Sequence, residues 1–472
     1  MWVERKRNAM RSSNANRMWW LIGVCLVVTV LLLLRNLFSA HSTSGSVSTI
    51  STGRVAVAQS SHAGPARPFR SSDPVPTRTA EEIVAGRMKQ FARSRRDIVR
   101  AMARQKGIEI PDVVERYFDA LESGDWNAVE ATFKILQGKD ASGDPSLRLP
   151  AVQALWGPIF DAYGAAEQVH LWPAQKLLDY GNAVLGSLRP GMVYVGGTDE
   201  GRWVPTLLND TSDGEQHIVI TQNALADATY LEYVRFLYGD RFTAPTTEDS
   251  RRAFEDYMAD ARKRLAHDTE FPDEPKQVRP GEQLKMEDNR FQVSGQVAVM
   301  DINERILRAM MEKNPDLSFA LQESFPLKGT YADAAPLGPI TELRAPDPAA
   351  FTPERAAQSV EYWRGVAEQL RTQPDESAEL TALKSFSKLA VGQANLFAEH
   401  GLVESAEQTY RIAREMLANN TEATTGLAEL LVRSGRSDEA RALLEQFARE
   451  FPKQSGDLKN TAAWTATISA GH

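Results

Sequence analysis

A glycine-rich segment near the middle of the chain, VYVGGTDEGRWVP, carries side chains that could bind a ligand. It contributes five candidate binding residues: Gly196, Gly197, Thr198, Asp199 and Arg202. The two adjacent glycines allow close backbone approach or a positive φ, and a guanidinium such as that of Arg202 binds phosphate or carboxylate. A helix that begins near Asp199 would also offer free N–H groups to an anion. The structural alternative is that Asp199 caps this helix and pairs with Arg202, so that no ligand is needed.

Further polar residues follow two other apolar runs, HIVIT and LSFAL, in the stretches TQNALAD and QESFPL. They are Gln222, Asn223 and Asp227 after the first run, and Glu323 after the second. Ligands bind beyond the carboxyl ends of parallel strands, so we expect these residues to meet Asp199 at one edge of a sheet. Two interpretations stand. One is a site for a sugar or a phosphorylated compound, with Asp199 as acid, base or polar anchor and the two amides as orienting groups. The other is a structural hydrogen-bonded network.

Short β-branched runs that alternate with helical stretches predict the elements that position these residues. Residues 189–346 are therefore expected to form a small parallel-sheet α/β domain, with ITELRA as a weaker fourth strand. The polar, proline-containing stretch from Arg264 to Phe291 interrupts this pattern and predicts a long excursion or loop. Residues 80–188 have apolar positions at helical spacing and predict a helical region.

An internal repeat with an offset of 34 residues marks residues 352–455, which we expect to form tetratricopeptide (TPR)-like helical hairpins. The matching pairs are Leu396 with Leu430, Gly401 with Gly435, and Ala406 with Ala440. The glycines would close the turns between helices, and the alanines would let the helices pack closely. Since about three repeats are needed for an independent solenoid, the pair should stack on the helices before it. It would either bind a protein partner or serve as a structural cap on the α/β domain. Residues 456–472 are expected to be a flexible tail.

The N-terminal part of the chain predicts a membrane anchor. Residues 18–38 contain an uncharged apolar run from Met18 to Leu34, which with a snorkelling Arg35 and then Leu37 and Phe38 reaches the ~20 residues needed to cross a bilayer. Five basic residues lie in 1–17, which the positive-inside rule places in the cytoplasm, with the main body extracytoplasmic at the inner (plasma) membrane. The alternative is a cleaved signal peptide, but the run is long and Phe38 stands where a small residue is expected. Residues 39–79 are rich in Ser, Thr, Gly and Pro and predict a disordered linker.

Composition and absent motifs narrow the function. The net charge is −8 and the first part of the chain is basic, so the acidic main body argues against a nucleic-acid partner. Cys25, the single cysteine, lies in the apolar run, and the seven histidines show no metal-ligand spacing, so we expect no metal and no cofactor. Phosphate-binding and hydrolase motifs are absent. A protein-binding scaffold or accessory factor is therefore favoured over an enzyme, with an envelope enzyme or sensor at Gly196–Arg202 as the alternative.

The stretches LGSLRPGMVYVGGTDEGRWVPTLL and HIVITQNALADATYLEYVRFLYGDR, together with the TPR pair, resemble a family of bacterial membrane-anchored TPR-containing proteins whose activity is not assigned. They are more distantly similar to the soluble C-terminal region of multi-pass membrane proteins related to protein mannosyltransferases. Those proteins have a PPG-x-hydrophobic-GDND-x-F stretch where this chain has RPGMVYVGGTDEGRW. The resemblance covers about residues 110–455. It implies no glycosyl transfer by this chain alone, because the catalytic region of those relatives lies in many membrane helices and this chain predicts one.

Overall fold

The fold is described from a computed structural model. It describes residues 78–139, 147–279, 282–287, 290–323, 325–343, 351–371, 379–454, 456 and 458. The predicted cytoplasmic tail and membrane anchor, and nearly all of the predicted linker, lie outside the described residues. Among the helices that are described, none combines the length and the apolar character needed to cross a bilayer.

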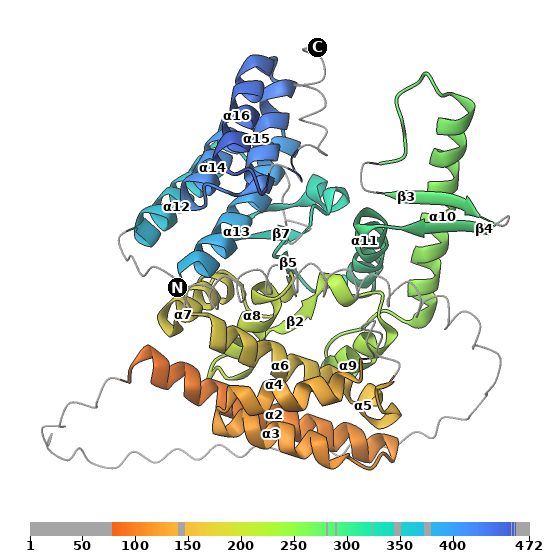
Figure 1. The fold of residues 1–472 in the computed structure, drawn as a ribbon, viewed down its shortest axis with the longest axis vertical. Helices are drawn as coiled ribbons and strands as arrows, with labels where there is room; N and C mark the ends of the chain where they lie inside the picture. Colours follow the sequence, from red (N-terminus) through yellow and green to blue (C-terminus); the bar gives the residue numbers. More distant parts are fainter. Residues whose placement is uncertain are drawn as a thin grey trace, which may run out of the picture.

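Six helices form one end of the molecule, where α2 packs on α3, α6 and α7 (Figure 1). They are α2 (Ala80–Lys106), α3 (Asp112–Ser123), α4 (Trp126–Gln137), α5 (Pro150–Ala154), α6 (Trp156–Leu171) and α7 (Ala174–Leu185). Local sequence sets their ends. Thr79 and Glu82 form a capping box at the start of α2. Gly124, at φ 76°, ends α3, and the side chain of Asp125 caps α4.

A five-stranded sheet lies between these helices and the C-terminal helices (Figure 1). Its strands are β1 (Val193–Gly196), β2 (Ile218–Thr221), β5 (Phe319–Leu321), β6 (Ala335–Leu337) and β7 (Ile340–Leu343), in the order β2-β1-β5-β7-β6. The first three are parallel and are the three strongest predicted strands. The prediction of a parallel sheet is wrong for the other half, because β7 is antiparallel to both β5 and β6. Only two residues separate β6 from β7, and such a connection makes a hairpin rather than a parallel crossover.

Helices connect the strands of the sheet along the chain. They are α8 (Glu200–Asp210), η2 (Gln222–Ala224), α9 (Ala228–Tyr238), α10 (Thr247–Glu270), α11 (Gln296–Lys313) and the 3-10 helix η3 (Lys328–Asp333). Of the two alternatives for Arg264 to Phe291, the structure shows an excursion with regular elements and not one long loop. The end of α10 occupies its first part, and an antiparallel hairpin of β3 (Gln283–Glu287) and β4 (Arg290–Ser294) follows. The charges and prolines of this stretch hide the apolar alternation that the hairpin uses.

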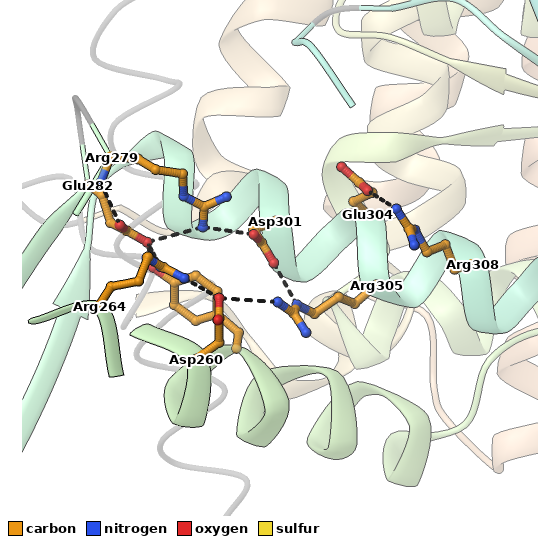
Figure 2. Close-up of polar contacts among 9 residues, drawn as sticks. Asp260, Arg264, Arg279, Glu282, Asp301, Glu304, Arg305 and Arg308 are labelled. Carbon is orange, nitrogen blue, oxygen red and sulfur yellow. Dashed lines mark hydrogen bonds and ion pairs between the residues drawn. The ribbon is translucent and has the colours of Figure 1, made fainter. Parts of the chain in front are cut away.

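Figure 2 shows how the hairpin is held against α10 and α11 by a closed ring of alternating charges. The six members in order are Glu282, Arg279, Asp301, Arg305, Asp260 and Arg264. Arg279 Nη2 lies 2.7 Å from Asp301 Oδ2, and Arg305 Nε lies 2.6 Å from Asp301 Oδ1. The carboxylate of Glu282 is fully buried and also accepts a 2.6 Å bond from the Tyr257 hydroxyl. Three positive and three negative charges therefore compensate one another where the segment before β3 meets α10 and α11.

The C-terminal helices are α12 (Pro353–Arg371), α13 (Glu379–Glu399), α14 (Val403–Met416), α15 (Thr421–Arg433) and α16 (Ser437–Glu450). The repeat positions act as predicted. Gly401 and Gly435 adopt φ 73° and 75° in the interhelical turns, and Ala406 and Ala440 are fully buried. Along most of its length α13 is buried on several faces, because it packs on α14 and also on α7 and β7. The first hairpin is thus joined to the sheet, whereas α15 and α16 extend away from it (Figure 1).

Candidate functional site

The predicted residues after β1, β2 and β5 lie at one edge of the sheet, because these three strands are parallel neighbours. From β1 the chain continues to β2 on one side, and from β5 it continues toward β7 and β6 on the other. The boundary between β1 and β5 is therefore the topological switch point, where open α/β sheets bind ligands.

The glycine-rich loop after β1 is pinned from both neighbouring strands. The Thr221 hydroxyl donates a 2.8 Å bond to the Gly197 carbonyl, and the Gly197 N–H donates a 2.9 Å bond to Gln322 Oε1. The Tyr194 hydroxyl donates a 2.7 Å bond to the Gly201 carbonyl. A Cβ at Gly201 would lie 1.6 Å from Gln322 Oε1, so a larger residue there would displace the Gln322 amide from this position. The side chain of Gln322, which the sequence did not single out, thus fills the switch point.

Asp199 has an unusual backbone conformation for a residue with a side chain. Its φ is 47° and its ψ is −112°, and it is the one non-glycine residue with positive φ in the described part of the chain. It stands at the N-cap of α8, but its carboxylate does not cap the helix and makes no hydrogen bond or ion pair with any described residue. Strain of this kind persists only where the surrounding structure over-determines it, and it concentrates at functional sites.

The spacing Gly197-Thr198-Asp199-Glu200-Gly201 reproduces, with an acid at its centre, the glycine-x-nucleophile-x-glycine turn of hydrolases. In that turn a strained residue between a strand and a helix presents its side chain at the top of the sheet. A search for serine at the central position misses this pattern, although the glycine spacing is present in the sequence. The arrangement presents the Asp199 carboxylate outward instead of using it as a cap.

Charges of both signs act on Asp199. Burial raises the pKa of the half-buried Asp199 to about 6, and the charge of Glu200 adds to the rise, against the opposing effect of Lys388 and Lys384 on α13 and of Arg202. Burial likewise raises the pKa of Glu167 on α6 to about 7, and the charge of Asp199 contributes to that rise. Glu167 is a second carboxyl group of the candidate site, and its sequence context gave no signal for it.

Arg202 does not pair with Asp199. Its guanidinium Nη2 lies 2.5 Å from Asp161 Oδ1 on α6, and Asp161 Oδ2 also lies 3.8 Å from Nε of the buried Arg95. Arg95 in turn is paired with Asp210 at the end of α8. A cavity of about 10 Å³ lies among these groups, which is room for roughly one water molecule. The charge of Arg202 is therefore compensated inside the protein, and anion binding by Arg202 stays a prediction.

Of the predicted residues after β2, Asp227 has a structural role, whereas Gln222 and Asn223 each have an oxygen with no donor in the described residues. Asp227 caps α9 by accepting bonds from Thr229 N–H at 2.8 Å and Tyr230 N–H at 3.4 Å. Gln222 is fully buried, and its Nε2 donates a 2.8 Å bond to the Gln322 carbonyl, while its Oε1 has no donor. Asn223 Oδ1 is also shielded from solvent and lacks a donor.

Glu323 does not join Asp199. Its carboxylate accepts a 3.0 Å bond from Asn395 Nδ2 on α13 and another from the Tyr331 hydroxyl. Burial raises the pKa of Glu323 to about 7. Nearby, Gln393 Nε2 donates to the carbonyls of Gly338 and Ile340 at 2.6 and 2.9 Å. Glu323 and Gln393 thus fasten the first TPR-like hairpin to the sheet.

No metal site is formed within the described residues, since they contain no group of three or more His, Cys, Asp or Glu side chains placed to hold an ion. A family model for the tetratricopeptide repeat matches residues 397–464, which span the end of α13 through α16. Neither the curated proteins nor the solved structures contain a match. The helices from the end of α13 through α16 are thus of the TPR type, which generally serves protein–protein interaction.

Proposed function

We propose that this chain is a membrane-anchored scaffold or accessory factor whose TPR-type helices bind a protein partner. The observation that carries the proposal is that, among the described residues, α13 is hydrogen-bonded to the sheet, whereas α15 is not. Helix α13 is committed to the sheet through Gln393 and Asn395, so the first hairpin acts as a cap. Helix α15 retains a polar face with unpaired acids, which is available to a partner.

This α15 face consists of Glu422, Thr425, Glu429 and Arg433, which follow one another at helical spacing. Glu422 and Glu429 make no hydrogen bond or ion pair with any described residue. The hydroxyl of Thr425 between them is buried and unpartnered. On the neighbouring helices, by contrast, Glu407 is paired with both Arg411 and Arg436. Unpaired carboxylates beside an unsatisfied hydroxyl favour a partner segment that carries lysine or arginine.

Site-specific photocrosslinking in cells tests this face. With a photoreactive amino acid at Arg433, we expect the full-length chain to form one dominant crosslinked species. The same group at Glu445 on α16, whose side chain is 48% exposed, should not form it. Reversing both charges, Glu422→Lys with Glu429→Lys, should reduce that species at least tenfold because the basic partner is then repelled. The matched reversal Asp438→Lys with Glu445→Lys should leave it unchanged. Equal crosslinking from both helices, or no effect of the first reversal, would contradict the proposal.

The membrane location belongs to the same proposal and is supported by the apolar residues 18–38 and the basic residues before them. In a Cys25→Ala background, a cysteine introduced at Glu445 should react in spheroplasts with a maleimide that does not cross membranes. A cysteine introduced at Ser12 should react only after lysis. The reverse pattern would place the main body in the cytoplasm, and reaction of both in spheroplasts would exclude a spanning anchor.

A second candidate function is ligand binding at the strand-end edge, as an enzyme or a sensor for a sugar or a phosphorylated compound. The specific observation in its favour is the carboxylate of Asp199, which is held in a strained conformation and has no partner. A residue needed only as a cap would bond the helix N–H groups, as Asp227 does at α9.

A further inference from the structure

Several acceptor atoms after β1 and β2 have no hydrogen-bond donor within the part of the chain that the structure describes. The carboxylate of Asp199 is an acceptor without a donor. Gln222 Oε1 is a second one, and its identity is fixed because the Nε2 of the same amide donates to the Gln322 carbonyl. Turning the amide over would set two oxygens against each other. Asn223 adds an amide that can accept or donate.

These groups belong to one place. Gln222 follows β2, yet its side chain reaches the carbonyl that follows β5, and β1 lies between those two strands. The Gln222 amide therefore crosses the end of β1, directly beside the loop that carries Asp199. The fully buried Gln222 thus brings one unpartnered oxygen, Oε1, to this edge. Trp203 Nε1, an orphan donor, lies on α8. Asn303 Nδ2, another orphan donor, lies on α11 close to the same edge, because Asn303 Oδ1 accepts a 3.2 Å bond from the Ala226 N–H just after η2.

The charges near Asp199 favour a neutral ligand over a phosphate group. A phosphate group brings only acceptors and negative charge at neutral pH, and it would face Asp199, Glu200 and Glu167. The charge of Arg202 is already compensated by Asp161, which leaves the α13 lysines as the nearby cations. A sugar hydroxyl is neutral and both donates and accepts, so it satisfies carboxylate and amide oxygens together.

We propose that the edge formed by Asp199, Gln222 and Asn223 binds a neutral, hydroxyl-rich ligand of the sugar class, with Asp199 accepting two hydroxyl donors. This inference rests on the second proposed function and narrows it. Gln222 Oε1 and Asn223 Oδ1 are closed to solvent in this structure. Asp199, which is half-buried, is therefore the point of first contact. Movement of the turn at η2 then brings in the two amides.

Titration calorimetry and ligand-observed NMR on the full-length chain test the proposal. The chain is purified in a detergent without a sugar headgroup. The probes are glucose, mannose, galactose and N-acetylglucosamine, against glucose 6-phosphate, mannose 6-phosphate and inorganic phosphate. We expect at least one neutral sugar to bind, with affinity at least tenfold lower for Asp199→Asn. Asparagine tolerates positive φ, so this variant keeps the turn. The matched change Asp213→Asn, on the exposed turn after α8, should leave binding unchanged.

The outcomes distinguish failure of the sugar class from failure of ligand binding at this edge. Binding of phosphate or sugar phosphates alone, lost in Asp199→Asn, would overturn the sugar class while the edge remained a ligand site. No binding of any probe to the folded chain would overturn both the sugar class and the second proposed function. Equal loss in Asp199→Asn and Asp213→Asn would show that the sugar binds elsewhere and would also overturn the inference. None of these results bears on the α15 face, which is tested separately.

Discussion

Asp161→Ala is expected to destabilise the protein by about 3–5 kcal/mol, because it leaves buried arginine charge without its carboxylate. The side chain of Asp161 is 6% exposed, and those of Arg95 and Arg202 are 2% and 11% exposed. After the change Arg202 loses its ion pair and keeps aromatic contacts, with its guanidinium carbon 5.2 Å from the ring centre of Tyr230, and the more distant charges of Asp199 and Asp227. Such aromatic contacts contribute at most about 2 kcal/mol each and do not replace a buried ion pair.

Urea unfolding of the two proteins measures the difference. Asp97→Ala serves as the control, since its side chain is 77% exposed and lies 3.9 Å from Arg100, and it should cost about 0–1 kcal/mol. Adding Arg202→Met to Asp161→Ala should recover part of the loss, because a well-packed apolar pair often substitutes for a buried ion pair. A loss below about 1 kcal/mol for Asp161→Ala alone would show that the network does not carry the stability assigned to it.

Glu323→Gln is expected to remove a pH dependence of stability between about pH 4.5 and 7. The folded pKa of Glu323 is about 7 and its ordinary value is 4.5, so the folded state binds the extra proton in this window. The free energy of unfolding of the wild type is therefore highest below the window and falls as the pH rises through it. One pKa unit corresponds to about 1.4 kcal/mol. The residual solvent contact of Glu323 reduces the full difference, so we expect about 1–3 kcal/mol.

Glutamine resembles the protonated acid and keeps the fastening to Tyr331 and Asn395 without a charge. The variant and the wild type should thus be similar at pH 4.5, and the variant should be the more stable by that amount at pH 8. Unfolding curves at pH 4.5, 6, 7 and 8 provide the test. Glu361→Gln, with a side chain 69% exposed, is the matched control and should show no such divergence. A difference that stays constant from pH 4.5 to 8 would rule out titration of Glu323 as its cause.

Local patterns were sufficient for much of the fold. The β-branched runs at Val193 and Ile218 identify buried parallel strands, and the 34-residue spacing from Gly401 to Gly435 identifies the repeat. These signals are contained in a few neighbouring residues. The direction of β7 is not, because it depends on how the chain between β5 and β7 returns, and the apolar run ITEL suits either direction.

The candidate site was predictable in position but not in the roles of its residues. Arg202 and Asp161 are 41 positions apart, so no local pattern shows that the arginine is already paired. Glu323 follows Gln322 directly, and successive side chains of an extended chain point to opposite sides. Gln322 therefore faces the glycine-rich loop, and Glu323, the residue that was singled out, faces the TPR-type helices.

This arrangement at the end of β5 has a thermodynamic consequence. The glycine-rich loop is hydrogen-bonded to Gln322, and the TPR-type helices are hydrogen-bonded to the very next residue. A displacement of this strand end would change both contacts at once. If the glycine-rich loop binds a ligand and the C-terminal helices bind a partner, as proposed, a ligand that favoured one position of β5 would alter the affinity for the partner. By linkage, the partner would alter the affinity for that ligand by the same factor.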